Sequence, residues 1–463
     1  MKATTVHFLS IYISCLLCSS TLAAEHNGVE VVTIKADDAC AVSDEDMEPL
    51  YKDNLYPDLD QWRSTRGQLN MSKFDQLVEA MPPNDVAKVL LVHKNKLYFP
   101  LQDDPTVCAS PCNRYWPPLL HAMREWAQPL PAAETPAAGS KDGRPYVVGG
   151  MTWPDGVYYV SVADWPVCGR ASETTPKRRC PAPALSLIKR VNVSAGMSRG
   201  VGLDIQIPLA PEQPGPPRLY SVPWARKERR AFWRGTPYCN GYRHRFTKCS
   251  RTHLANLTQH LQHLPDKGAS LGGGIVLDVQ FAAQPRRGGR GKRGRKARGG
   301  GGRKAGQDSA AASAGGQNYT SIKDHARYAF LVHMDGITAS NRLPKLMATD
   351  SPVLKQESMW GEHFQRSLKP GVHYIPIFKD GPDDILQVLR HYADGSHDAQ
   401  LQRVAANAQA FAAKFLCARA RMLYLRKALE SYGSLFTDMQ GAVEARWWPM
   451  VQQKLDRAAR EDE

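Results

Sequence analysis

The chain is 463 residues long and 42% of its residues are hydrophobic, which is enough for two domains with cores of their own. Its formal net charge of +15 would by itself suggest a nucleic-acid-binding protein. However, ten Arg and Lys residues with no acidic residue fall between Arg286 and Lys304, and 15 minus 10 leaves only +5 for the rest of the chain. The charge therefore belongs to one segment, and we expect no nucleic-acid partner.

The first 24 residues have the pattern of a secretory signal peptide. Lys2 is followed by an apolar run over 8–22 and by small residues at Ala23 and Ala24. A retained membrane anchor is the alternative, although the run is short for a bilayer span. We expect cleavage near Ala24, no membrane span after it, and a mature protein in the lumen of the secretory pathway (endoplasmic reticulum or Golgi) or outside the cell.

The next part of the chain alternates between helical and strand-like patterns, which favours an α/β architecture. The segments 58–81 and 117–126 are helical in pattern, and 96–99 is a short strand. The apolar segment 157–164 is a further strand and ends in a carboxylate, Asp164. Ligands of open α/β sheets bind beyond the carboxyl ends of strands, although an aspartate at such a place is more often a turn former.

A low-complexity insert covers 285–317, after an apolar strand at 274–281. It has almost no large apolar residue, so burial cannot offset the entropy of ordering it, and we expect a disordered loop. Arg/Gly tracts can bind RNA. In a secretory protein a solvated surface insertion is the simpler interpretation, and contact with an acidic glycan or another polyanion is the alternative.

The stretch 327–342 reads as an apolar strand, a turn and the start of a helix. Ser340 or Asn341 can cap this helix, and Pro344 is tolerated in its first turn. A strand that leads into a helix N-terminus forms an anion site, because free N–H groups and the helix dipole point beyond the strand. Arg342 adds a forked, permanently charged donor suited to phosphate.

Helical patterns return at 383–391 and at 398–436. The second is long, with apolar residues at alternating steps of four and three, so we expect it to pack along the rest of the protein. The last residues, 460–463, do not form a Lys-Asp-Glu-Leu-type retrieval signal, so residence in the endoplasmic reticulum is not encoded there.

Two of the ten cysteines lie in the expected signal peptide, which leaves an even number, as in proteins of an oxidising compartment. Their spacing suggests three local pairs and leaves one pair for a long-range bridge, which would stabilise the fold by roughly 2–5 kcal/mol. A zinc site is the rival interpretation, but the mature chain has no paired Cys-x-x-Cys units. The expected pairs are Cys108 with Cys112, Cys168 with Cys180, Cys239 with Cys249, and Cys40 with Cys417.

Several motifs occur in a specific order along the chain. In that order they resemble the motifs of the protein O-glucosyltransferase family, which is related to the fungal capsule-associated glycosyltransferases. The likeness covers most of the mature chain and is strongest over 230–436. The motifs are Asp164-Trp-Pro166, Phe232-Trp-Arg-Gly235, the stretch 328–342, 351–358, Glu362-His-Phe364 and 368–377.

The resemblance implies an α/β fold of the GT-B type, with two Rossmann-like domains and a long C-terminal helix that crosses back to the first domain. It implies the long-range Cys40–Cys417 bridge as well. The expected units are the signal peptide (1–24), an acceptor-side domain (25–220), a donor domain that contains the insert (221–400), C-terminal helices (401–440) and a tail (441–463).

The resemblance further implies an enzyme that transfers glucose or xylose from a UDP-sugar to a hydroxyl of a protein or glycan, with inversion. Asp164 would act as the base that takes the proton from the acceptor. The diphosphate would be stabilised by arginines and by amides at the helix start. The expected donor-binding residues are Arg234, Gly235, Gly336, Ile337, Thr338, Ala339, Ser340, Asn341 and Arg342.

Three more residues, Ser186, Lys189 and Asp204, lie in segments similar to those that line the cleft between the family's domains. The sequence leaves a role as ordinary strand and loop residues equally open. We expect no cofactor and no metal, because the two Asp-x-Asp runs, 44–46 and 58–60, lie far from the donor motifs. We expect a monomer; the alternative to an enzyme is a catalytically inactive member of the fold that binds a glycan or a polyanion.

Overall fold

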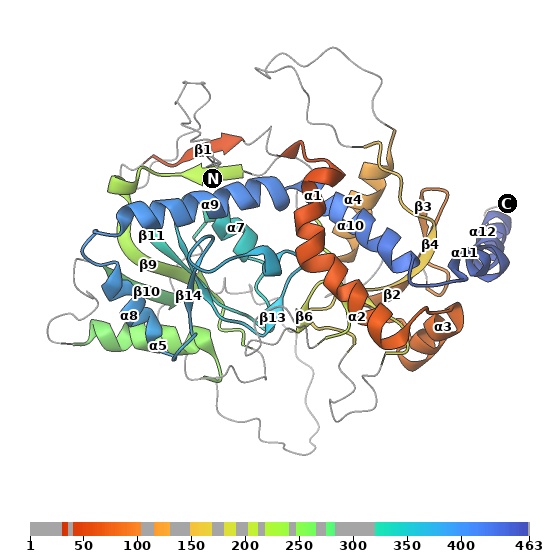
Figure 1. Ribbon diagram of the computed structural model, residues 1–463, viewed down its shortest axis with the longest axis horizontal. Helices are drawn as coiled ribbons and strands as arrows, with labels where there is room; N and C mark the ends of the chain where they lie inside the picture. The colour runs from red at the N-terminus through yellow and green to blue at the C-terminus, as the bar shows by residue number, and fades with distance from the viewer. Residues whose placement is uncertain are drawn as a thin grey trace, which may run out of the picture.

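The computed structural model describes residues 30–35, 40–102, 115–129, 149–168, 180–190, 202–211, 218–239, 247–264, 275–282 and 320–461. The expected signal peptide, the insert 285–317 and the pair Cys108–Cys112 lie outside these ranges. The described chain is a mixed α/β structure with a five-stranded sheet in each half of the molecule (Figure 1). No helix within these ranges combines the length and the apolar character that a membrane span requires.

The first sheet is mixed, because β4, β5 and β7 are parallel whereas β2 is antiparallel to both β3 and β4. The turn between β2 and β3 explains one of these reversals: Lys94 and Asn95 have φ values of 49° and 61°, which suit a tight hairpin. The sheet thus departs from the wholly parallel sheet of an ideal Rossmann-like domain. Its strands, in sheet order, are β3 (Lys96–Tyr98), β2 (Ala87–His93), β4 (Gly156–Ser161), β5 (Leu185–Ser186) and β7 (Ile205–Gln206).

The helices of the first half come from the N-terminal part of the chain and from the segment before β4. The prediction of one continuous helix over 58–81 is wrong, because Gly67, with a φ of 65°, ends the first helix. A new helix starts after Asn70, whose side chain accepts a hydrogen bond from the Lys73 amide. These helices are α1 (Asp44–Leu50), a π-helical turn (Tyr51–Leu55), α2 (Tyr56–Arg66), α3 (Met71–Ala80) and α4 (Trp116–Ala127).

The second sheet is parallel throughout. Its strands are rich in buried apolar residues, as expected for a sheet with helices on both faces. In Figure 1, α5 (Ser250–Gln262) and α8 (Asp384–His391) lie below the sheet, and α7 (Leu343–Met347) lies above it. The strands, in sheet order, are β10 (Val276–Phe281), β9 (Glu228–Gly235), β11 (Tyr328–His333), β12 (Val353–Gln356) and β14 (Ile375–Ile377).

Two small antiparallel sheets accompany the large ones. β1 (Val32–Lys35) pairs with β8 (Arg218–Ser221). β13 (Trp360–Gly361) follows the fourth strand of the second sheet and pairs with β6 (Lys189–Arg190) of the first half, so this ladder joins the two halves directly.

The C-terminal helices run over both halves (Figure 1). The expected helix over 398–436 is broken in two, α9 (Asp398–Phe415) and α10 (Ala418–Gly433). Cys417 has an extended backbone at the break, and its sulfur is bonded to Cys40. α9 packs against α7 in the second half, whereas α10 contacts β4 in the first, and α11 (Met439–Ala442) and α12 (Trp448–Glu461) follow.

A buried ionic cluster also joins the halves; we call Asp58, Lys189 and Arg366 the Asp58 cluster. Asp58, on α2, is 1% exposed and lies 2.7 Å from Lys189 and 2.5 Å from Arg366, which follows β13. Burial by itself would raise the pKa of Asp58, but the charges of Arg366 and Lys189 hold that pKa below its usual range. Both cations of the cluster therefore pair with the same buried carboxylate.

Candidate active site

The carboxyl edge of the second sheet brings together polar side chains from separate strands. Because the strands are parallel, β9, β11 and β12 all end on this edge. Asp335 and Ser358 each follow a strand by two residues, and Ser358 Oγ donates a hydrogen bond of 2.5 Å to Asp335 Oδ2. The Asp335 amide donates to Gln356 Oε1 at 3.0 Å. These contacts hold the loop after β11 against the end of β12.

The helix that follows this loop is short, since α7 spans five residues. Its N-cap is Arg342, and no side chain caps it. The expectation that Ser340 or Asn341 caps the helix is therefore wrong, whereas Pro344 lies in the first turn as expected.

The Arg342 side chain points toward the carboxyl end of β9. Its Nη1 donates a hydrogen bond to the main-chain oxygen of Arg234. Its Cζ lies 5.8 Å from the centre of the Trp233 ring. The guanidinium therefore lies where the ends of two neighbouring parallel strands meet.

The Arg234 side chain has a partner of its own. It is 4% exposed, its Nη1 lies 2.8 Å from Asp278 Oδ1, and its Cζ lies 4.4 Å from the centre of the Phe232 ring. Its charge is thus matched by a carboxylate on β10. The next residue, Gly235, is required by packing, because a Cβ there would lie 2.6 Å from the Trp233 ring.

Arg251, which the sequence did not single out, is the second guanidinium at this edge. It lies at the start of α5 and is 8% exposed. Nη1 donates to the main-chain oxygen of Thr236 at 3.1 Å and Nη2 to that of Met334 at 3.4 Å. Burial and the neighbouring charge of Arg342 lower the pKa of Arg251 to about 10. Two cations therefore lie near each other, and the carboxylate of Asp335 partly offsets their repulsion without forming an ion pair with Arg251.

Close packing at Arg251 accounts for the glycine of the loop. A Cβ on Gly336 would lie 3.0 Å from Arg251 Nη2, so a larger residue would displace the guanidinium. Trp233 lies under both cations, with Arg251 Cζ at 5.4 Å from its ring centre. One feature of the sequence could have drawn attention to Arg251. It lies two residues after Cys249, and the predicted Cys239–Cys249 bridge fixes the start of α5.

The loop 336–342 presents both backbone and side chains to this edge. Ile337 is 39% exposed, whereas Thr338 is buried and its Oγ1 has no hydrogen-bond partner among the described residues. Ala339 and Ser340 are partly exposed. His333 Nε2 lies 3.2 Å from the Ser340 main-chain oxygen and must donate to it, because a carbonyl oxygen can only accept. Burial lowers the pKa of His333 to about 3, so the ring is neutral.

Burial also changes the acids and bases of this edge. It raises the pKa of Asp335 to about 6, although the hydrogen bond from Ser358 and the charges of Lys355 and Arg251 oppose it. It lowers the pKa of Lys355, whose Nζ donates to the main-chain oxygen of Gln356 at 3.2 Å. The edge therefore carries more positive than negative charge.

Asp164 lies three residues after β4, in an exposed turn of the first half. The Tyr115 hydroxyl lies 3.5 Å from its Oδ1. The next residue, Trp165, packs edge-to-face on Trp360 of β13, with 5.5 Å between the ring centres. The Trp360 amide donates to Ser358 Oγ at 2.9 Å, so a chain of contacts leads from the Asp164 turn to the edge of the second sheet.

The three other candidates, Ser186, Lys189 and Asp204, are all buried. Lys189 belongs to the Asp58 cluster, and Ser186 Oγ donates to Asp204 Oδ1 at 2.6 Å. Asp204 also accepts from the amides of Val167 and Cys168, although burial still raises its pKa to about 6. All of these contacts are to groups of the protein itself, and they fasten the chain just after the Asp164 turn.

The two Asp-x-Asp runs have contacts within the fold as well. Asp44 pairs with Arg426, and Asp46 forms a capping box with Ser43 at the start of α1. Asp58 belongs to the Asp58 cluster.

The disulfides agree with the spacing of the cysteines. Three predicted pairs, Cys40–Cys417, Cys168–Cys180 and Cys239–Cys249, are confirmed. The long-range pair ties the segment before α1 to the break between the two C-terminal helices.

Comparison with known proteins identifies the family. The family model of glycosyl transferase family 90 matches residues 218–460, which is more than half of the chain. The chain therefore belongs to glycosyl transferase family 90.

Its curated relatives are named as O-glucosyltransferases. Protein O-glucosyltransferase 2 of Danio rerio is 35% identical over 117 residues, which are 25% of this chain and 23% of the relative. Protein O-glucosyltransferase 3 of Homo sapiens is 26% identical over 292 residues, 60% of this chain and 47% of the relative. The O-glucosyltransferase rumi of Drosophila pseudoobscura pseudoobscura is 33% identical over 122 residues, which are 25% of this chain and 28% of the relative. The chain thus spans less than half of the length of each of these relatives.

A solved structure of the Anabaena protein HepE in complex with UDP-glucose is 13% identical to this chain. The matched region covers 26% of this chain and 31% of the HepE chain, with a TM-score of 0.20. This likeness is too slight to bear on the fold or the ligand.

Proposed function

We propose that the protein is an inverting glycosyltransferase that moves glucose or xylose from a UDP-sugar to a hydroxyl of a protein serine or threonine, or of a glycan. The family match and the names of the relatives support this proposal. The observation that carries it is the pair Arg251 and Arg342 at the carboxyl edge of the second sheet. Arg251 is buried beside another cation without a carboxylate paired to it, which is costly unless an anionic ligand supplies the missing charge.

In the proposed complex the diphosphate of the donor lies between these two guanidinium groups and the loop 336–342. Arginine suits this role because its planar fork binds two phosphate oxygens at once. Arg234 acts through its main-chain oxygen, which orients Arg342, and its side chain holds Asp278. Gly235 lets the chain pack closely against Trp233, and Gly336 lets the loop lie against Arg251.

Transfer then proceeds in one displacement. The Asp164 carboxylate takes the proton of the acceptor hydroxyl while the acceptor oxygen forms a bond to the anomeric carbon. The bond from that carbon to the diphosphate oxygen breaks on the opposite face, and the leaving UDP takes the electron pair. Arg251, Arg342 and the amides of the loop stabilise the charge that develops on UDP, so the protein's own groups suffice without a metal.

The proposal places the protein in the lumen of the secretory pathway, as a monomer. The three disulfides support an oxidising compartment.

The test is UDP release by the full chain against a panel of UDP-sugars, with and without EDTA, in the presence of peptide and glycan acceptors. We expect release with one sugar that survives EDTA. Asp164→Asn should lower turnover by roughly 100- to 10,000-fold and leave UDP affinity unchanged. The matched control is Asp456→Asn, at an exposed aspartate on α12, which should behave as the wild type. Absence of release with every sugar would favour the inactive, glycan-binding alternative.

A further inference from the structure

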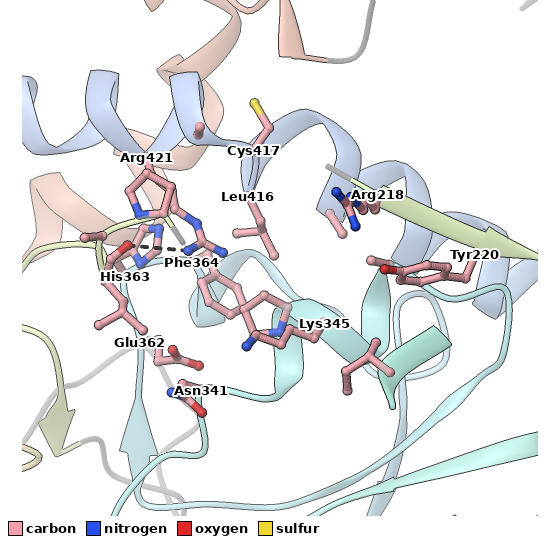
Figure 2. Close-up of a pocket in the computed structure, with 18 residues that line it drawn as sticks. Arg218, Tyr220, Asn341, Lys345, Glu362, His363, Phe364, Leu416, Cys417 and Arg421 are labelled. Carbon is pink, nitrogen blue, oxygen red and sulfur yellow. Dashed lines mark hydrogen bonds between the residues drawn. The ribbon is translucent and has the colours of Figure 1, made fainter. Parts of the chain in front are cut away.

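A cavity lies where the two halves of the molecule meet. We call it the hinge cavity; its volume is about 360 Å³. It is enclosed by the segment 209–211, β8, α7, the segment 362–364 and the break between α9 and α10 (Figure 2). The polar side chains that line it are Arg218, Tyr220, Asn341, Lys345, Glu362 and Arg421.

Glu362 is the unusual residue of this cavity. It is 8% exposed, and its carboxylate makes no hydrogen bond or ion pair with any of the residues that the structure describes. Figure 2 shows this carboxylate on the same side of the cavity as the Asn341 amide. Burial raises the pKa of Glu362 to about 7, although the charge of Arg421 opposes this rise. A buried carboxyl without a partner is costly, so a ligand that donates hydrogen bonds to it would be stabilised there.

The charge around Glu362 favours an anion. Arg218, Lys345 and Arg421 line the same cavity, so three cationic side chains and one carboxylate line it. Arg421 is held in place by a hydrogen bond of 3.5 Å from its Nη1 to the main-chain oxygen of Leu209 (Figure 2). Forked arginine donors are suited to phosphate and carboxylate groups.

The remaining walls are apolar and partly aromatic. Tyr220, Phe364 and Leu416 line the cavity, together with short side chains of α9 and α10. Apolar walls with a few convergent polar groups are typical of sites for small molecules. A ligand that fits has an anionic group for the cations, hydroxyl groups for Glu362 and Asn341, and C–H surfaces for the aromatic rings.

The hinge cavity adjoins the proposed donor loop, but the arginines proposed to hold the diphosphate do not line it. Asn341 and Arg342 are adjacent in the chain, but Arg342 contacts the main-chain oxygen of Arg234, whereas Asn341 lines the hinge cavity. Neither Arg251 nor Trp233 lines this cavity.

We propose that the hinge cavity binds a small anionic sugar, that is, a phosphorylated or carboxylated monosaccharide, with its hydroxyl groups on Glu362 and its anionic group on Lys345 and Arg421. This ligand is separate from the UDP-sugar donor. Because Asn341 belongs to the loop 336–342 and lines the cavity, occupancy also restrains this loop.

The test is calorimetric titration of the full chain with glucose 6-phosphate in the presence of saturating UDP, which keeps the donor site filled. We expect saturable binding with one site per chain. Glucuronic acid in place of glucose 6-phosphate distinguishes a carboxylated from a phosphorylated ligand, and either one binding supports the site. Glucose, which lacks the anion, and inorganic phosphate, which lacks the sugar, should each bind at least tenfold more weakly.

Variants locate the bound sugar. Glu362→Gln and Lys345→Met should each weaken binding about tenfold, which corresponds to one charge-assisted hydrogen bond. Lys369→Met, at an exposed lysine that does not line the cavity, is the matched control and should leave the affinity unchanged. UDP affinity, measured separately, should stay unchanged in all three variants, which shows that they fold. Absence of saturable binding by both anionic sugars, or equal affinity in Glu362→Gln and wild type, would overturn the proposal.

Discussion

Two clusters of buried charge in this molecule differ in how their charges are matched. In the Asp58 cluster, the carboxylate lies within 2.7 Å of both Lys189 and Arg366, and the three groups join the two halves. At the carboxyl edge of the second sheet, Arg251 is also buried, at 8% exposed, but its hydrogen bonds go to main-chain oxygens. Buried cations that form ion pairs with a carboxylate hold a fold together, whereas a buried cation without such an ion pair is a candidate ligand-binding group.

The largest effect should come from breaking the matched cluster. Asp58→Asn removes the only carboxylate of the Asp58 cluster and leaves two buried cations, so we expect a loss of roughly 3–5 kcal/mol in the free energy of unfolding. The control is Asp60→Asn, at an exposed aspartate on the same helix. Denaturant unfolding of the two variants measures the loss of stability. UDP affinity of the folded protein should not change. Equal stability of the two variants would show that the cluster is not structural.

The next effect concerns the unmatched cation. Arg251→Met keeps much of the side-chain volume but removes the charge, and we expect UDP-glucose to bind about 10- to 100-fold more weakly, the range for charged hydrogen bonds. The free energy of unfolding should stay the same or rise, because the mutual repulsion with Arg342 is lost. Equilibrium titration and thermal unfolding of one sample measure both. A large loss of stability with unchanged affinity would place Arg251 among the structural charges.

A smaller effect should separate the shape of the arginine fork from its charge. Arg342→Lys keeps a cation but cannot bind two oxygens side by side while it also donates to the main-chain oxygen of Arg234. We expect roughly tenfold weaker UDP-glucose binding. Arg390→Lys, at an exposed arginine on α8, serves as the control. Identical affinities in the two variants would contradict a forked contact.

The smallest effect is a pH dependence. The pKa of Asp335 is raised to about 6, so this carboxyl becomes neutral below pH 6 and the site becomes more positive. UDP-glucose, whose diphosphate ester keeps its charge, should therefore bind roughly threefold more tightly at pH 5 than at pH 7.5, as for one partly screened charge. His333 does not titrate in this window, because its pKa is about 3.

The same group contributes to stability with a definite sign. Its folded pKa lies above the ordinary value of 3.8, so the folded state binds more protons between pH 4 and pH 6, and stability from this group falls as pH rises through that window. Asp335→Asn should abolish the pH dependence of the affinity and remove this group's share of the pH dependence of stability, whereas Asp204, whose pKa is also raised to about 6, keeps its own share. An affinity in this variant that still changes threefold between pH 5 and pH 7.5 would assign the effect to another group.

Local patterns predicted the elements well but not their interruptions. The strand at 328–333, the turn after it and the short helix with Pro344 follow from apolar runs and turn residues. The break at Gly67 needs a positive φ, which sequence periodicity does not reveal. The break at Cys417 is not visible in the sequence, because the helical pattern runs through it without interruption. It coincides with the bridge to Cys40, 377 residues away, which no local pattern reveals.

The candidate site could be predicted only as far as single segments allow. Arg342 and the glycine of its loop lie in one stretch, so the sequence pointed to them together. Arg251 comes from a different helix and becomes part of the site only because parallel strands bring their ends together. The partner of Arg234 is likewise on a neighbouring strand, 44 residues further on, and no local pattern distinguishes an arginine that pairs with Asp278 from one that awaits a phosphate.

The most direct test of the central claim is to compare the affinities of UDP and UMP for the wild type and for Arg251→Met, by calorimetry on the full chain. If Arg251 and Arg342 together hold a diphosphate, the wild type should bind UDP at least tenfold more tightly than UMP, and Arg251→Met should lose most of that preference. Equal affinities of the wild type for UDP and UMP, or a preference that Arg251→Met retains in full, would contradict the assignment of this edge as the diphosphate site.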